Sequence, residues 1–157
     1  MSEKVFLSKL QEHQRIIYKL VHLYAVDEED KKDLYQEIVL QARKAFPRFR
    51  GESAFSTWLY RLCLNTIFTL KRKVNRVEYT DTLQYEDRPT DAAHNDDAEL
   101  LYTAIRTLNE ADRAIISMHL DGYSNAEIAD CMGLSLNSVG VRLHRIKQQL
   151  ATILKKV

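Results

Sequence analysis

Apolar residues recur along most of this chain at the three- and four-residue spacing of amphipathic helices, and strand-like alternation is not seen in the sequence. In the N-terminal half, this pattern predicts three helices, which begin near Arg15, in the acidic run at 27–30, and at Phe55. Pro47 should end the second helix, because proline cannot donate the next backbone hydrogen bond. The expected core positions are Ile17, Leu20, Val21, Tyr24, Leu34, Ile38, Ala42, Ala45, Phe55, Trp58, Leu59, Leu62 and Ile67.

The C-terminal half carries local signals that predict where four further helices begin and end. Asn109 can cap one helix, and Ser124 with Glu127 has the spacing of a capping box. Gly133 can form a left-handed turn, and Ser135 can cap the last helix. The expected core positions are Leu100, Leu101, Ala104, Leu108, Ile115, Ile116, Met118, Ile128, Ala129, Met132, Val139, Leu143, Ile146 and Leu150. A short helix, a glycine turn and a capped longer helix predict a helix-turn-helix, with a purely structural helical hairpin as the alternative.

The segment between the two helical blocks, residues 75–97, is polar and acidic and shows no period. Such a composition is typical of an extended, flexible linker. We therefore predict an all-α protein in which two small helical domains, residues 1–74 and 98–157, are joined by an acidic flexible linker.

The formal net charge of +1 hides an uneven distribution along the chain. Residues 1–77 hold 15 Lys or Arg and 9 Asp or Glu, whereas residues 78–99 hold 1 and 8, and residues 100–157 hold 7 and 5. Two basic modules joined by an acidic strap fit a protein that binds a polyanion. Solvated charged faces without a partner give the same distribution.

The remaining composition argues against a membrane protein and against an enzyme. No apolar run approaches the ~20 residues of a membrane span, and charges interrupt the N-terminal residues, so no secretory signal is expected. Cys63 and Cys131 lie in apolar helical patterns, which predicts buried free thiols in a reducing cytoplasm. The sequence lacks a glycine-rich phosphate loop, metal-ligand spacing and a nucleophile–base pair. We therefore expect no catalysis, cofactor, metal site or small-molecule substrate.

The last helix of the expected helix-turn-helix has an outward face that could read DNA. At about 100° per residue, the face opposite the core stripe shows Asn137, Val141, His144 and Gln148, flanked by Ser138 and Arg145. Asn and Arg can bond base edges, and Val can contact a thymine methyl group. Gly140 and Lys147 lie on the other flank, where a phosphate would pass. Glycine inside a helix costs about 1 kcal/mol relative to alanine.

Three segments of the chain resemble the bacterial RNA polymerase sigma factors, most closely the extracytoplasmic-function (ECF) group. The stretch GYSNAEIADCMGLSLNSVGVRLHRIKQQL resembles their fourth region. The stretches DKKDLYQEIVLQARKAF and FRGESAFSTWLYRLCLNTIFTLKRK resemble two segments of their second region, in the same order. The resemblance covers about residues 10–74 and 98–151. It implies a promoter-recognition factor with core RNA polymerase and promoter DNA as partners, and an anti-sigma factor as its regulator.

The resemblance also assigns roles to matching positions. It implies that core polymerase is bound by Asp30, Asp33, Gln36 and Glu37. The loop after the second helix would capture a flipped base of the minus-ten element, and the third helix would contact the melting duplex. The minus-ten residues are Phe49, Arg50, Glu52, Ser53, Arg61, Asn65, Lys71, Arg72 and Lys73. The minus-thirty-five residues are Asn137, Ser138, Val141, Arg142, His144, Arg145 and Lys147.

The chain departs from the family pattern at Gly140 and Val141, where Lys or Arg and then a small polar residue are usual. Without that cation, the strength of minus-thirty-five binding does not follow from the resemblance. Two other functional classes remain as alternatives: a free-standing helix-turn-helix regulator, and a helical adaptor or anti-sigma interaction protein. The match of the segment FSTWLYRLCLN to the second region argues against both.

Overall fold

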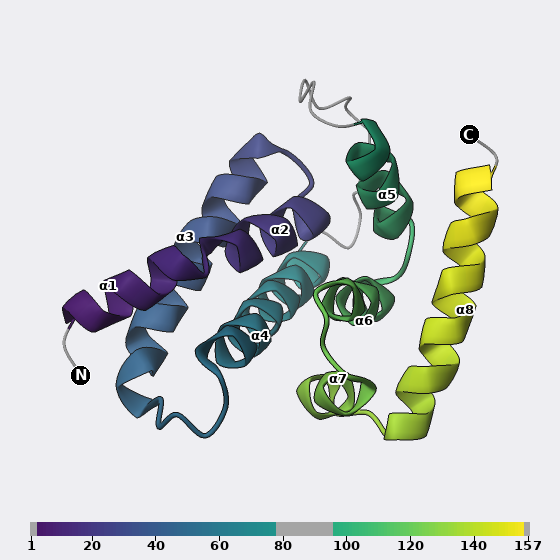
Figure 1. Cartoon of the computed structure of the whole chain (residues 1–157). Coiled ribbons are helices and arrows are strands. Elements are labelled where there is room, and N and C mark those ends of the chain that lie inside the picture. The colour runs from purple at the N-terminus through teal and green to yellow at the C-terminus, as the bar shows by residue number, and fades with distance from the viewer. Residues whose placement is uncertain (1–2, 78–95, 156–157) are drawn as a thin grey trace. The chain divides into compact units, whose positions relative to one another are not determined.

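The computed structural model describes residues 3–77 and 96–155, and every regular element in these ranges is a helix (Figure 1). The chain divides into two compact units, the first within residues 1–87 and the second within residues 88–157. This confirms the all-α class. The predicted linker at 75–97 proves shorter at both ends, because one helix reaches Val77 and the next begins at Asp96. The rest of the linker lies outside the described residues.

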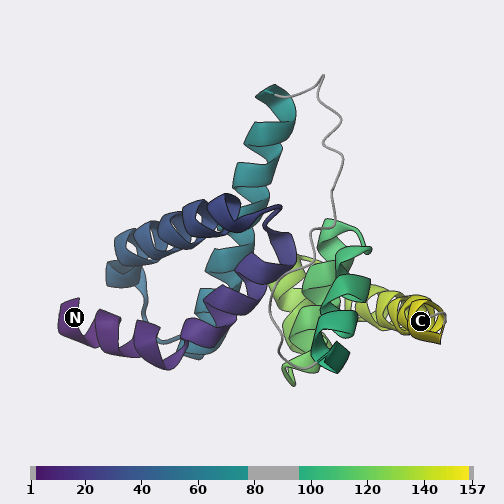
Figure 2. The same cartoon turned by 90° about the horizontal axis from the view of Figure 1, so that it is seen from above.

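The first unit consists of α1 (Glu3–Glu12), α2 (Gln14–Tyr24), α3 (Glu28–Ala45), a short 3-10 helix (Phe46–Arg48) and α4 (Phe55–Val77). Helices α2, α3 and α4 pack against one another (Figure 2). Their fully buried side chains include Ile17, Leu20, Leu23, Ile38, Leu59, Tyr60 and Ile67. Ala45, Trp58 and Leu62 were expected in this core but are only half-buried.

Helix α1 was not predicted from the sequence. Its apolar pattern is short, since only Phe6 and Leu10 are buried while Val5 and Leu7 remain exposed. One residue, His13, separates α1 from α2, and its backbone leaves the helical region with φ −117° and ψ 17°. The first unit therefore has four α-helices where the sequence predicted three.

Helix α3 begins and ends where the sequence indicated. Asp27 caps it by accepting a hydrogen bond from the backbone N–H of Asp30 at 2.7 Å. Glu28, Glu29 and Asp30 place negative charge in the first turn, where it complements the helix dipole. The last residue of α3 is Ala45, and Pro47 lies two residues later, inside the 3-10 helix that continues the chain.

The second unit consists of α5 (Asp96–Arg106), α6 (Glu110–Leu120), α7 (Asn125–Met132) and α8 (Leu136–Lys155). Helix α8 contacts each of the other three. Its predicted stripe, Val139, Leu143, Ile146 and Leu150, is buried throughout. In α5 the prediction of Leu100 as a core residue was wrong, because Leu100 is exposed. Ala104 and Ile105 are buried.

The two cysteines differ in their surroundings, although both are free. Cys63 is buried, and desolvation raises the pKa of its thiol well above the usual value. Cys131 is only half-buried, which corrects the expectation of two buried thiols.

Candidate nucleic-acid interface

Four aromatic rings that contact one another lie at the two ends of the loop that connects α3 to α4. We call Phe46, Phe49, Phe55 and Trp58 the aromatic cluster. The ring centroids of Phe49 and Trp58 are 5.3 Å apart, as are those of Phe55 and Trp58. Phe46 stacks on Phe49 at 6.0 Å. These are favourable separations for aromatic pairs. Phe46 and Phe55 are buried, while Phe49 and Trp58 are half-buried, so the cluster joins the core to the surface.

The loop above this cluster presents polar side chains to solvent. Arg50, Glu52 and Ser53 are exposed, as base capture would require. Gly51 adopts φ 72°, a left-handed conformation that side-chain-bearing residues rarely adopt. Gly51 was not among the predicted site residues, although a glycine in a short loop between helices is a sign of such a turn.

Three of the polar side chains predicted on α4 share one exposed face of the helix. At about 100° per residue, Arg61, Asn65 and Arg72 fall within roughly 40° of one another, and all three are exposed. The Nε of Arg72 donates to the carbonyl of Phe68 at 3.4 Å. Lys71 lies on the flank of this face, about 100° around the helix from Arg72.

Two residues that the sequence assigned to different partners form an ion pair with each other. The Nζ of Lys71 lies 3.2 Å from Oδ2 of Asp30. The same oxygen accepts a hydrogen bond from the backbone N–H of Val26 at 3.0 Å. The side chain of Lys71 is 20% exposed and that of Asp30 is 27% exposed. Asp30 therefore secures the start of α3 and holds a cation of α4, in addition to any role in docking.

The other predicted docking residues lie further along α3. Asp33 and Gln36 are exposed, and Glu37 is half-buried and accepts a hydrogen bond from Gln41 at 2.9 Å. Leu40 lies on the same face and is 44% exposed. Leu40 was not predicted as part of this face, because the pattern of buried positions in α3 gives no sign of an apolar residue on the outer face.

Local signals set the geometry of the helix-turn-helix. The hydroxyl of Ser124 accepts from the backbone N–H of Glu127 at 3.1 Å, and the Glu127 carboxylate accepts from the backbone N–H of Ser124 at 3.0 Å. These hydrogen bonds lower the pKa of Glu127. Gly133 ends α7 with φ 68°, and Ser135 caps α8 by accepting from the backbone N–H of Ser138 at 3.1 Å. The predicted capping box, turn and cap are all confirmed.

The outward face of α8 is available for contact. Asn137, Val141 and His144 are exposed, and Val141 retains 59% exposure. Among the described residues, no hydrogen bond or ion pair occupies the side chains of Asn137, His144 or Lys147.

Arg142 and Ser138 differ from these residues. Arg142 turns toward α6, where its Nη1 lies 3.7 Å from Oδ1 of Asp112. Asp112 is 13% exposed, and this oxygen has no hydrogen-bond partner in the described structure, because 3.7 Å is too long for a hydrogen bond. Ser138 is half-buried. The two residues therefore lie at the edge of the outward face.

Gly140 has a right-handed helical backbone and open space beside it. A Cβ atom built at this position would have no neighbour within 4 Å. Packing within the protein therefore does not require glycine here.

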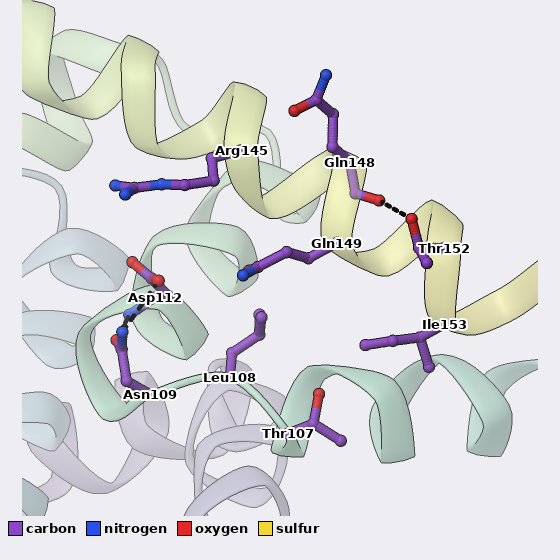
Figure 3. Close-up of a pocket in the computed structure, with 9 residues that line it drawn as sticks. All are labelled: Thr107, Leu108, Asn109, Asp112, Arg145, Gln148, Gln149, Thr152 and Ile153. Carbon is purple, nitrogen blue, oxygen red and sulfur yellow. Dashed lines mark hydrogen bonds between the residues drawn. The ribbon is translucent and has the colours of Figure 1, made fainter.

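A pocket of about 450 Å³ lies beside the outward face, between α8 and the turn from α5 to α6 (Figure 3). Arg145 and Gln149 extend from α8 over this pocket, with Asp112 and Leu108 opposite (Figure 3). Arg145, a predicted minus-thirty-five residue, thus borders both surfaces. The pocket is also lined by Thr107, Asn109, Gln148, Thr152 and Ile153.

Comparisons with known proteins agree with this architecture. The family model described as Sigma-70 region 2 matches residues 10–77, and that described as Sigma-70, region 4 matches residues 98–150. The chain is 27% identical over 146 residues to the ECF RNA polymerase sigma factor SigM of Mycobacterium tuberculosis, covering 90% of this chain and 73% of SigM. It is 29% identical over 164 residues to the ECF RNA polymerase sigma-E factor of Escherichia coli, covering 94% of this chain and 85% of that protein.

Two solved structures share the fold. The sigma factor RpoE of Bartonella quintana, crystallised with the anti-sigma factor NepR, gives a TM-score of 0.81 at 21% identity, covering 97% of this chain and 98% of RpoE. CnrH, in complex with the cytosolic domain of CnrY, gives a TM-score of 0.68 at 20% identity, covering 99% and 90%. The two matched regions span well over half of the chain in the order expected of one family. The chain belongs to the sigma-70 family as an ECF RNA polymerase sigma factor, a transcription initiation factor with a DNA-binding helix-turn-helix in its region 4.

Proposed function

We propose that this sigma factor divides promoter recognition between its two units. The first unit docks on core RNA polymerase through the exposed face of α3, captures a base of the minus-ten element in the loop at 49–54, and helps melt the duplex. The second unit reads the minus-thirty-five element with the outward face of α8. The polymerase supplies the chemistry, and the sigma factor acts without catalysis of its own.

The observation that carries this proposal is the exposed polar loop supported by the aromatic cluster. Arg50, Glu52 and Ser53 are exposed and follow Phe49, whose half-buried ring contacts that of Trp58. A flipped base needs a fixed pocket whose polar groups can form hydrogen bonds with the edge of the base. The exposed residues of α4 lie on the next element along the chain and could contact the phosphates beside such a base.

We further propose that an anti-sigma factor regulates this protein in the cytoplasm. Both solved relatives are complexes, one with the anti-sigma factor NepR and the other with the cytosolic domain of CnrY. Within residues 3–77 and 96–155, no helix is both long and apolar enough to cross a membrane.

Run-off transcription from genomic DNA fragments, with core polymerase alone and with the added chain, tests the main proposal. We expect transcripts from defined start sites only when the chain is present. Nanomolar, sequence-specific binding by the isolated chain without polymerase would instead favour a free-standing regulator.

The docking face has its own test. Charge reversal by Asp33→Lys with Glu37→Lys should weaken association with core polymerase while circular dichroism stays native, since both residues lie outside the buried stripe of α3. Lys32→Glu, on another exposed part of the helix, is the matched control. Unchanged binding of core polymerase by the double variant would show that docking uses another surface.

A further inference from the structure

Helix α1 packs against the segment from which the proposed base-capture loop starts. Phe6 is 3% exposed, and its ring centroid lies 5.1 Å from that of Phe46. Phe46 is itself 3% exposed and stacks on Phe49, the first residue of the loop. A continuous chain of aromatic contacts therefore leads from α1 to the loop.

Two further contacts tie α1 to the same region. The Nζ of Lys9 lies 5.6 Å from the ring centroid of Phe55, which is close enough for a cation–π interaction. Near the start of α1, Glu3 forms an ion pair with Arg43 at the end of α3. Together with the Phe6 contact, they hold α1 along both sides of the loop, at the end of α3 and at the start of α4.

The loop has little backbone support of its own. At its edges, the backbone N–H of Phe49 donates to the carbonyl of Phe46 at 2.9 Å, and the backbone N–H of Trp58 donates to the carbonyl of Ala54 at 3.1 Å. The position of the loop must therefore be set largely by the rings at its two ends. The match to region 2 begins at residue 10, so Phe6 lies outside it.

We propose that α1 is a brace for the base-capture loop and that Phe6 is its positioning residue. Phe6 touches no DNA; through Phe46 and Phe49 it fixes where Arg50, Glu52 and Ser53 meet the separated strand. This inference rests on the proposed function of the loop. An extruded base exists only after melting begins, so the brace acts on open-complex formation and leaves polymerase docking and duplex binding unchanged.

The test compares Phe6→Ala with Leu7→Ala in the full chain assembled with core polymerase. Leu7 lies on the same helix and is 53% exposed, so its loss should leave the loop in place. We expect Phe6→Ala to lower open-complex formation on duplex promoter DNA, followed by permanganate reactivity, by about tenfold. Binding of core polymerase should equal that of the parent protein, and Leu7→Ala should match the parent in both measurements.

A loop variant separates failure of the brace from failure of the loop itself. Phe49, Arg50 and Ser53 are replaced together by alanine, and Phe6→Ala is then added to that background. If the brace acts through the loop, the added substitution causes no further loss. A further tenfold loss would place the action of Phe6 elsewhere and overturn the proposal.

The remaining outcomes are also decisive. Normal opening by Phe6→Ala beside defective opening by the loop variant would overturn the brace and leave the loop function standing. Normal opening by the loop variant would overturn the loop function, and the brace with it. If Phe6→Ala fails to bind core polymerase, Phe6→Leu, which keeps an apolar side chain without the ring, takes its place under the same criteria.

Discussion

The two proposed DNA-contacting surfaces are supported in opposite ways. The loop of the first unit rests on rings contributed by the 3-10 helix and by α4, and also on a ring of α1 that lies 40 positions before Phe46. The outward face of α8 rests on a stripe of the same helix and on caps within a few residues of it. The loop should therefore be sensitive to substitutions that never meet DNA, whereas the recognition helix should respond mainly to changes on its outward face.

The two surfaces also differ in how their polar side chains are engaged before any partner arrives. In the first unit, Lys71 is paired with Asp30, and Arg72 donates to a carbonyl of its own helix. In the part of the second unit that the structure describes, Asn137 and His144 have no such engagement. The proposed DNA contacts would therefore break or share contacts at Lys71 and Arg72 on the first surface. On the second surface they would meet one paired cation, Arg142, beside the unengaged side chains of Asn137 and His144.

The largest expected effect tests the distributed support. Phe46→Ala removes a buried ring at the centre of the aromatic cluster and should lower the free energy of unfolding of the first unit by about 3–5 kcal/mol. Trp58 is the only tryptophan, so its fluorescence follows this unit in urea titrations of the full chain. Arg48→Ala, at an exposed position two residues away, is the control. A loss below 1 kcal/mol would mean that the cluster does not hold the loop.

The local support of the second unit should give a smaller loss. Ser124→Ala removes the hydroxyl of the capping box and should cost about 1 kcal/mol. Circular dichroism in a urea titration should show the loss, while Trp58 fluorescence should keep the midpoint of the parent protein. A matching shift in fluorescence would show that the two units unfold together and would break the comparison.

The next prediction concerns the shoulder of the recognition helix. Gly140→Ala should stabilise the second unit by about 0.5–1 kcal/mol, because the added methyl group meets nothing and the unfolded chain loses freedom. Gly140→Lys should steepen the slope of log affinity against log salt for holoenzyme on promoter DNA by about one. If either variant folds normally but no longer binds the promoter, DNA itself requires glycine there.

The smallest expected effect concerns the engaged cation of the first unit. Asp30→Asn keeps an acceptor for Val26 but releases Lys71, which should steepen the salt dependence of duplex binding by the free chain by about one unit. The same substitution in a Lys71→Met background should change nothing. An equal change in both backgrounds would mean that the negative charge of Asp30 acts on DNA directly.

Features that depend on neighbouring residues could be predicted from the sequence, whereas features that depend on distant residues could not. The caps at Asn109, Ser124 and Ser135 and the turn at Gly133 depend on residues a few positions apart, so their patterns could be read directly. Helix α1 could not be predicted in this way, because Phe6 is buried against Phe46, which lies 40 positions further along the chain.

The candidate sites divide in the same manner. The outward positions Asn137, Val141 and His144 followed from helical rotation alone. The pairing of Asp30 with Lys71, 41 positions apart, depends on how α3 and α4 pack, and a one-dimensional pattern does not contain that information. The predicted contacts with polymerase and DNA themselves stay predictions.

The ion pair between Asp30 and Lys71 bears on how the free protein would divide between non-specific DNA and solution. Non-specific affinity for DNA grows with the number of counterions that a protein displaces. A sigma factor that neutralises one of its own cations displaces about one fewer, so a smaller share of its copies is titrated by the excess of non-promoter sequence. More copies of the free chain would then remain available to core polymerase.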